Sequence, residues 1–216
     1  QMFLTLSSRN IKHLHLYASF FIDEFNSKRL SNDEHNLISY KAGFNVSNWP
    51  LKNLNYGFEY TRTNTLNYKH SIQALTWASN SYNLGHYLGD NAQQFYAYIG
   101  YKPIRKVDIK LSYTKDQKGN DYDYVRRNTK QTLSQAILKD IVWENDLIAL
   151  RATYEVFPNA YAVVNIEYNN ARGHDITSEP IEGENRFDAQ GYLDKYTPKF
   201  YQGENWTITA GFSIGF

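Results

Sequence analysis

The sequence predicts an all-β protein, an antiparallel transmembrane β-barrel with about nine strands in its 216 residues. Three observations lead to this prediction. Apolar and polar residues alternate in successive segments, and the segments are long enough to cross a membrane. The connections between them alternate between tight turns and long loops. Side chains of a strand point to its two faces in turn, so each such segment is a strand with one apolar face.

The last segment, residues 205–216, shows the pattern most clearly. Trp206, Ile208 and Phe212 point one way, and small polar residues such as Thr209 point the other. This suits a barrel strand with lipid on one side and a polar lumen on the other, and a final aromatic residue resembles the insertion signal of bacterial outer-membrane barrels. The alternative is the edge strand of a soluble β-sandwich.

Eight earlier segments alternate in the same way. In chain order they are residues 2–8, 12–25, 37–48, 54–63, 93–102, 107–114, 146–157 and 160–168. Leu14 to Ile22, Ile38 to Val46 and Val107 to Tyr113 are examples of apolar residues at every second position. Strands of about 10–13 residues, tilted by about 40°, span an apolar layer about 25 Å thick.

The connections fall into two classes. The tight ones lie near residues 9, 49, 103 and 158, and the long ones cover residues 26–36, 64–92, 115–145 and 169–203. Pro50, Pro103 and Pro158 mark three of the tight turns. Tight turns at one end and long loops at the other are typical of outer-membrane barrels, whereas a soluble sandwich has no reason to sort its loops. Within the third long loop, residues 132–141 are expected to form a short helix.

Composition excludes several functions. The net charge of +1 offers no electrostatic basis for binding nucleic acid, and the absence of cysteine removes thiolate metal sites and cysteine nucleophiles. A mean hydropathy of −0.63 is compatible with a membrane barrel, because only every second strand residue faces lipid. His13 and His15 share a strand face, but such a pair is more often a pair of lumen residues than a zinc site, so no cofactor or metal is expected.

The strand count leads to a further expectation. The last strand runs from the long-loop end to the tight-turn end, and so does the first of about nine strands. Single-chain bacterial barrels have an even number of strands. We therefore expect this sequence to be the C-terminal part of a larger barrel.

Four blocks of residues resemble a known family. They are Tyr17–Phe25, Glu59–Arg62, Tyr68–His70 and Leu84–Asn91. Their order and spacing are similar to those of the Wzi-type capsule assembly proteins, in the form found in Bacteroidota. The resemblance implies a multi-pass outer-membrane barrel of about eighteen strands, of which nine strands are half. It also implies a lectin-like, non-catalytic role in attaching or assembling capsular polysaccharide or exopolysaccharide.

The long loop over residues 64–92 offers candidate saccharide contacts. Binding a sugar requires aromatic faces for its C–H surface and polar groups for its hydroxyls. The candidates are Trp77, Tyr82, His86, Tyr87 and Asp90. The alternative is ordinary packing of this loop over the mouth of the barrel.

A second set of charged residues is expected near the outer rim. These are Asp23, Glu24, Glu59 and Arg62. Charges in a barrel lumen usually pair across strands, so we interpret this set as a polar interior network rather than a binding site.

Three functions remain open: a surface lectin or anchor for polysaccharide, a porin-like channel, and a structural subunit of an outer-membrane secretion or uptake complex. Catalysis is not expected. His70, His86 and Asp90 have no convincing nucleophile beside them. The G-x-S-x-G match at residues 211–215 lies inside a strand, where a nucleophile elbow cannot form.

Overall fold

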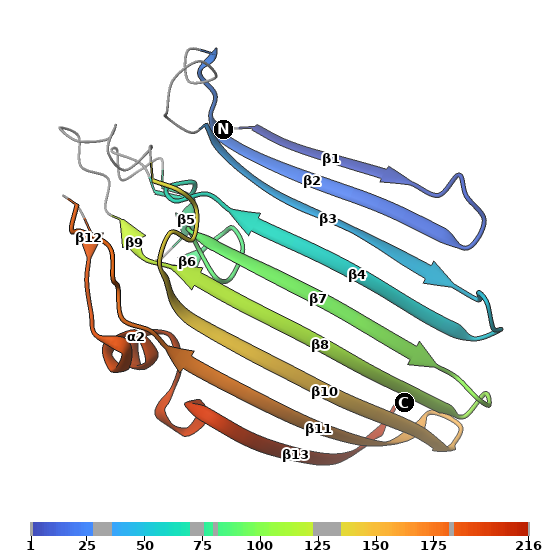
Figure 1. The fold of residues 1–216 in the computed structure, drawn as a ribbon. Helices are drawn as coiled ribbons and strands as arrows, with labels where there is room; N and C mark the ends of the chain where they lie inside the picture. Colours follow the sequence, from blue (N-terminus) through green and yellow to red (C-terminus); the bar gives the residue numbers. More distant parts are fainter. Residues whose placement is uncertain are drawn as a thin grey trace.

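The computed structural model describes residues 2–27, 36–69, 76–79, 82–122, 135–181 and 184–215. Its main feature is a single antiparallel sheet of nine strands, in which neighbours in the chain are neighbours in space (Figure 1). Those strands are β1 (Met2–Ser8), β2 (Leu14–Glu24), β3 (Leu37–Ser47), β4 (Leu54–Thr63), β7 (Ala92–Tyr101), β8 (Val107–Gly119), β10 (Ile141–Phe157), β11 (Ala160–Gly173) and β13 (Gly203–Ile214). The all-β class and the nine strands are thus confirmed, while the described sheet is open, with β1 and β13 at its edges.

Short elements lie at the loop end of the sheet. β5 (Ala78–Ser79) pairs with β6 (Tyr82–Asn83), and β9 (Asp121–Tyr122) pairs with β12 (Glu184–Asn185). Helix α2 (Ala189–Tyr196) and the 3₁₀ turn η3 (Lys199–Tyr201) precede β13. As expected, the tight turns all lie at the opposite end (Figure 1). Asn159 takes the left-handed conformation that a two-residue turn requires, with φ of 63°.

Register places the apolar residues of all nine strands on one face. One row of paired residues crosses eight strands: Leu14, Val46, Tyr56, Ile99, Leu111, Leu150, Ile166 and Ile208. β1 adds Leu4 and Leu6 on the same face, because they pair with Phe20 and Ala18. We call this surface the apolar band. It is uncovered in the described part of the chain, and Ile208 remains 72% exposed.

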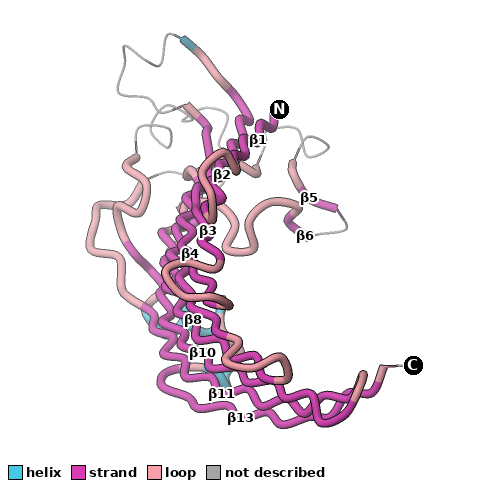
Figure 2. Tube along the Cα trace, turned by 90° about the vertical axis from the view of Figure 1, so that its right-hand side faces the viewer, coloured by secondary structure: helices cyan, strands magenta, loops and turns pink. Residues whose placement is uncertain are grey.

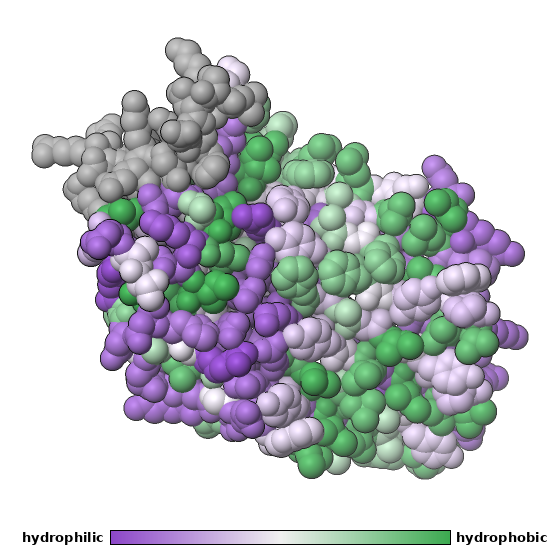
Figure 3. Space-filling model, viewed as in Figure 1, coloured by the Kyte–Doolittle hydropathy of each residue, from purple (hydrophilic) through white to green (hydrophobic). Residues whose placement is uncertain are grey.

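The sheet curves, and the apolar band lies on its convex side. Figure 2 shows the sheet edge-on, with β5 and β6 on the concave side. Figure 3 looks onto the convex side, where hydrophobic side chains gather over the middle of the strands and hydrophilic ones lie toward the loops. The hydrophilic zone continues the same face, since Lys115 pairs in register with Asp146 and Arg172 with Glu144.

Three strands extend further toward the loops than the sequence predicts. β8 continues to Gly119, β10 begins at Ile141 and β11 continues to Gly173. The residues added to β8 and β11 are mostly polar, and those added to β10 begin with three consecutive apolar residues, Ile141, Val142 and Trp143, so alternation with a period of two marks none of the three extensions. Ion pairs between neighbouring strands stabilise these strand ends, for example the pair of Arg172 Nη2 with Asp146 Oδ2 at 2.8 Å.

Small clusters of buried residues take the place of a central core. One contains Leu88, Ala92, Val142, Trp143 and Tyr192, and it joins the loop before β7 to β10 and α2. The other contains Leu37, Leu66 and Tyr122. Both clusters lie at the loop end. The apolar residues of the protein therefore form two groups, the apolar band on the strands and the buried clusters under the loops.

The helical elements differ from the prediction. Residues 135–140 are turns and bends, so the helix expected over residues 132–141 is wrong for its described part, and 132–134 lie outside the described residues. Conversely, α2 lies within residues 169–203, which the sequence predicts to be a loop. Asp188 caps α2 by accepting a hydrogen bond from the Gly191 amide at 2.8 Å, and Tyr192 is its one buried residue. An internal glycine and a single buried position explain why no helical period stands out.

Gly173 controls how closely α2 approaches the sheet. A Cβ atom there would lie 1.9 Å from the backbone oxygen of Ala189. Gly173→Ala is therefore expected to displace α2 and to lower the melting temperature by several degrees, with a cost of about 1–3 kcal/mol. Gly211→Ala is the matched control, because a Cβ at Gly211 meets nothing within 4 Å. Equal melting temperatures for the two variants would contradict this packing.

Candidate functional site

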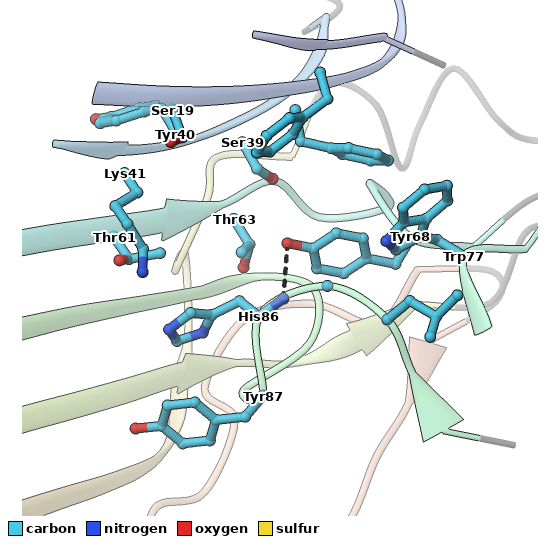
Figure 4. A pocket seen from close by; sticks show the side chains of 14 residues that line it. Ser19, Ser39, Tyr40, Lys41, Thr61, Thr63, Tyr68, Trp77, His86 and Tyr87 are labelled. Atoms are coloured by element: carbon cyan, nitrogen blue, oxygen red, sulfur yellow. Dashed lines mark hydrogen bonds between the residues drawn. The ribbon is translucent and has the colours of Figure 1, made fainter. Parts of the chain in front are cut away.

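A cavity of about 690 Å³ opens on the concave side, between β2–β4 and the loop that joins β4 to β7 (Figure 4). We call the described part of that loop, residues 64–69, 76–79 and 82–91, the covering loop. It crosses the concave face instead of extending away from the sheet. The cavity has the size of an ordinary small-molecule site, about 300–1,000 Å³.

One side of the cavity is aromatic. Phe21 of β2 lies between two rings of the covering loop, with its centroid 5.5 Å from Tyr68 and 5.3 Å from Trp77. Phe21 and Tyr68 are buried, whereas Trp77 is partly exposed. Trp77 therefore offers a free ring face, and the buried ring of Phe21 holds it in place.

A glycine allows the covering loop to pass over Tyr68. A Cβ at Gly85 would lie 2.3 Å from the Tyr68 ring, so a larger residue would push the loop away. The Tyr68 hydroxyl accepts a hydrogen bond from the His86 amide at 3.1 Å. The position of His86 thus depends on Tyr68 and on the absence of a side chain at residue 85.

The other side of the cavity is polar. Lys41 Nζ lies 3.0 Å from Glu59 Oε1, and Tyr17 donates a hydrogen bond of 2.7 Å to Glu59 Oε2. Thr61 also lines the cavity, is 5% exposed, and has no hydrogen-bond partner for its hydroxyl. Register explains this cluster, because Lys41 and Thr61 are directly paired across β3 and β4.

His86 faces this polar side from the covering loop (Figure 4). Burial lowers the pKa of its imidazole, and the nearby Lys41 ammonium lowers it further, against the hydrogen bond to Gln94 that raises it. Its Nε2 atom donates to Gln94 Oε1 at 3.4 Å and its Nδ1 atom accepts from the Leu88 amide at 3.4 Å, and both are long contacts. His86 is therefore neutral at pH 7, and both of its ring nitrogens are only weakly bonded.

Tyr87 anchors the covering loop to the sheet. Its hydroxyl donates to Asp116 Oδ2 at 2.6 Å and accepts from the Gln94 amide, which also donates to Asp116 Oδ1 at 2.8 Å. Burial and the Asp116 carboxylate together raise the pKa of the Tyr87 phenol well above its usual value. This bonded tyrosine is a structural contact as well as part of the cavity wall.

A buried ionic cluster lies behind the cavity. Lys118 Nζ donates to the backbone oxygens of Leu88 and Asp90, each at 2.9 Å, and lies 3.3 Å from Asp121 Oδ1. Asp121 Oδ2 also accepts from Lys195 Nζ at 2.7 Å. The cluster therefore joins the covering loop, β8, β9 and α2.

Asp90 is the buried carboxyl group of the covering loop. Its Oδ1 accepts a hydrogen bond from the Tyr68 amide at 2.8 Å. Burial raises the pKa of Asp90 to about 7, although the Tyr68 amide and the cations of Lys69 and Lys118 act in the opposite direction. The loop thus holds a proton more tightly when docked than when open.

This shift predicts a pH dependence. Since the docked-state pKa exceeds the value of 3.8 for a free carboxyl, the stabilisation that Asp90 gives to docking is fully present below about pH 4 and is lost as pH rises toward about 7. Hydrogen exchange of the peptide containing Tyr68, corrected for intrinsic rates, should show this loss of protection. Asp90→Asn retains the acceptor oxygen and should remove this loss, so that protection no longer falls as pH rises; the lowered pKa of His86 acts in the opposite direction in both proteins. A profile as steep as that of the wild type would contradict this role.

The structure brings three of the five predicted saccharide residues together. Trp77, His86 and Tyr87 all line the cavity. Tyr82 does not, and is 78% exposed on β6. Asp90 is buried behind the cavity and serves the structure of the loop.

Two of the four predicted rim residues, Glu59 and Arg62, lie on opposite faces of β4 and so do not share one network. Glu59 lies in the middle of β4 and pairs with Lys41 and Tyr17. Arg62 lies on the opposite face of β4, where it pairs in register with Tyr40 and Gln93. Asp23 and Glu24 are consecutive residues at the loop end of β2.

Among the cavity residues that sequence reasoning missed, four matter most for the site: Phe21, Lys41, Thr61 and Tyr68. One signal was available, because Phe20, Phe21 and Ile22 are all apolar and interrupt the alternation. Such a run indicates that both faces of the strand are covered at that point. No local pattern marks Lys41, Thr61 or Tyr68. Lys41 and Thr61 line the cavity because the covering loop crosses their strands, and Tyr68 of that loop does so because it packs against Phe21 of β2.

The described residues contain no group of three His, Cys, Asp or Glu side chains placed to hold a metal ion. No helix in the same part of the chain is long and apolar enough to cross a membrane. Comparison with known proteins adds no identity: no family model, curated protein or solved structure matches this chain.

Proposed function

We propose that this chain forms part of the wall of a bacterial outer-membrane β-barrel and attaches surface polysaccharide through its concave side, without catalysis. The observation that carries the proposal is the apolar band, which is continuous across nine strands and which no described residue covers. Lipid is the covering that such a face requires, since a soluble protein rarely exposes so large an apolar surface.

The polarity along the strands supports the same placement. The apolar band gives way, toward the loops, to charged and amide side chains such as Lys115, Glu144 and Arg172. Aromatic residues of the band, including Tyr113 and Tyr168, lie near this boundary. Aromatic rings at the edge of an apolar layer are typical of membrane interfaces.

In this placement the open sheet is a sector of a larger barrel. β1 and β13 have one paired neighbour each in the described sheet, so closure requires each to pair with a further strand. The resemblance to Wzi-type capsule assembly proteins supplies the expected size of about eighteen strands.

The cavity supports the polysaccharide part of the proposal. It combines an exposed ring face at Trp77 with polar groups at Lys41, Thr61 and His86. Sugars bind to surfaces of this kind, because their C–H faces contact aromatic rings and their hydroxyls need donors and acceptors. The covering loop also occupies the concave side, which favours a binding role over a wide channel.

The test uses the native protein in mild detergent and the polysaccharide extracted from the surface of the producing cell. We expect the immobilised polysaccharide to retain the wild-type protein and to bind Trp77→Ala about tenfold more weakly. Tyr82→Ala is the control, because this exposed ring lies outside the cavity. A protein that fractionates away from the outer membrane, or that binds no surface polysaccharide, would disprove the proposed function.

A second candidate is a structural subunit of an outer-membrane complex. The unpaired edges of β1 and β13 favour it, because strands of another protein could pair with them as well as strands of the same chain. Stable copurification with other envelope proteins, together with no polysaccharide binding, is the result that would favour this alternative.

A further inference from the structure

We propose that the cavity under the covering loop takes a neutral sugar residue, with the ring packed against Trp77 and its hydroxyls bound by Thr61, Lys41 and His86. This inference rests on the proposed function and goes beyond it by naming the class of sugar. It follows from the distribution of polar groups, charges and ring faces around the cavity.

The cavity is divided in two. Tyr68 and Trp77 lie toward the loop end, and Lys41, Thr61 and His86 lie toward the middle of the strands (Figure 4). A sugar ring has the same division, because its C–H face is apolar and its edge carries hydroxyls. Phe21 packs against both aromatic residues and keeps the ring of Trp77 fixed before a ligand arrives.

Thr61 supplies an independent indication of a ligand. Its hydroxyl is buried beside the cavity and has no hydrogen-bond partner, although buried polar groups in proteins are nearly always paired. Its neighbours on the concave face are already engaged: Thr63 donates to the Gly89 oxygen at 2.7 Å, and Ser39 accepts from the Asn64 amide at 3.2 Å. The oxygen itself is fully buried, so the side chain has to turn toward the cavity before a ligand hydroxyl can satisfy it.

The charges around the cavity indicate that the sugar is neutral. The Lys41 ammonium is balanced by Glu59 at 3.0 Å, and His86 is neutral because burial lowers its pKa. Asp116 adds a carboxylate behind Tyr87, bonded at 2.6 Å. A carboxylate or phosphate on the sugar would therefore find the one charged residue of the lining, Lys41, already paired, with the two carboxylates lying behind the cavity wall.

Lys41 and Glu59 are suited to hydroxyl groups as they stand. An ammonium group donates three hydrogen bonds and a carboxylate accepts several, so each can bind a hydroxyl without breaking their contact. Lys41 remains accessible, with 41% of its side chain exposed. The uncharged imidazole of His86 adds its Nε2 atom, whose contact with Gln94 is long enough, at 3.4 Å, for a ligand hydroxyl to replace it.

The experiment measures binding of methyl glycosides to the native protein in detergent by saturation-transfer NMR. The neutral probes are the methyl glycosides of glucose, galactose and mannose, and the acidic probe is methyl glucuronide. We expect at least one neutral probe to bind about tenfold more tightly than methyl glucuronide. Equal or tighter binding of the acidic probe, or no binding of any probe, would overturn the inference.

Thr61→Val is the decisive variant. It keeps the shape and the β-branching of the side chain and removes only the unpaired hydroxyl, so the melting temperature should be unchanged or higher. Binding of the neutral probe should weaken about five- to tenfold. Thr209→Val, on the concave face of β13, is the control and should bind as the wild type does.

The outcomes separate this inference from the proposed function. If the wild type retains the native polysaccharide but Thr61→Val and Trp77→Ala bind neutral probes normally, the sugar lies elsewhere and the inference fails alone. If the wild type retains no polysaccharide, the proposed function fails as well.

Discussion

Replacing Leu150 with arginine is expected to prevent stable insertion of the protein into a bilayer. Leu150 lies at the middle of β10, between Leu111 and Ile166 in the row that crosses the apolar band. An arginine on the lipid face of a barrel costs about 2–4 kcal/mol at the middle of the membrane. That cost is a large fraction of the stability of an ordinary domain, about 5–15 kcal/mol.

Ala149→Arg provides a matched control in the same strand. Ala149 points to the concave side, where its cross-strand neighbours are Ser112 and Glu167. The arginine there would stay in a polar environment and could pair with the Glu167 carboxylate. The two variants therefore add the same residue at adjacent positions and differ only in the face that receives it.

The measurement is folding into phosphatidylcholine vesicles, followed by the urea concentration at which half of the protein unfolds. We expect the midpoint to fall for Leu150→Arg and to stay near the wild-type value for Ala149→Arg. Similar midpoints for both variants would mean that the convex face does not meet lipid. That result would remove the main support for an outer-membrane location.

The strands could be predicted from the sequence because each carries its own signal. Alternation such as that of residues 206–212 depends only on a period of two and on one face being apolar. The same rule fails where a strand becomes polar on both sides. Gln117 and Glu144 continue their strands through cross-strand pairing, which no local pattern reveals.

The site was predictable only in part, for a related reason. The aromatic residues and glycines of the covering loop marked it as unusual, and Trp77, His86 and Tyr87 do reach the cavity. Their partners come from other elements, because Phe21 lies more than 45 positions before Tyr68 and Trp77 and yet packs against both. Periodicity assigns a residue to a face but does not say which loop will cover that face.

The second large effect is expected at Lys118. This ammonium group is almost fully buried, and it bonds two backbone oxygens of the covering loop as well as Asp121. Burial opposes ionisation of Asp121, but Lys118, Lys195 and the Tyr196 hydroxyl outweigh that effect and hold the pKa of Asp121 well below its usual value. The carboxylate is therefore charged at neutral pH and depends on its cations.

Lys118→Met keeps the length of the side chain and removes the charge. It leaves Asp121 without one of its two cations and leaves the oxygens of Leu88 and Asp90 unpaired. Removing one partner of a buried ion pair typically costs about 3–5 kcal/mol. We expect a large fall in melting temperature and rapid hydrogen exchange in both the covering loop and α2, because Asp121 also binds Lys195 of α2.

Lys102→Met is the control for the loss of a lysine charge. Lys102 lies 2.9 Å from Asp108, but their side chains are 54% and 46% exposed, so this pair contributes only about 0–1 kcal/mol. In the double variant Lys118→Met with Asp121→Asn, the stranded carboxylate is neutralised and part of the stability should return. If Lys118→Met melted no lower than Lys102→Met, the cluster would not be what holds the covering loop against the sheet. The cavity would then have a movable wall, and the fixed position of Trp77 beside Phe21 would need another cause.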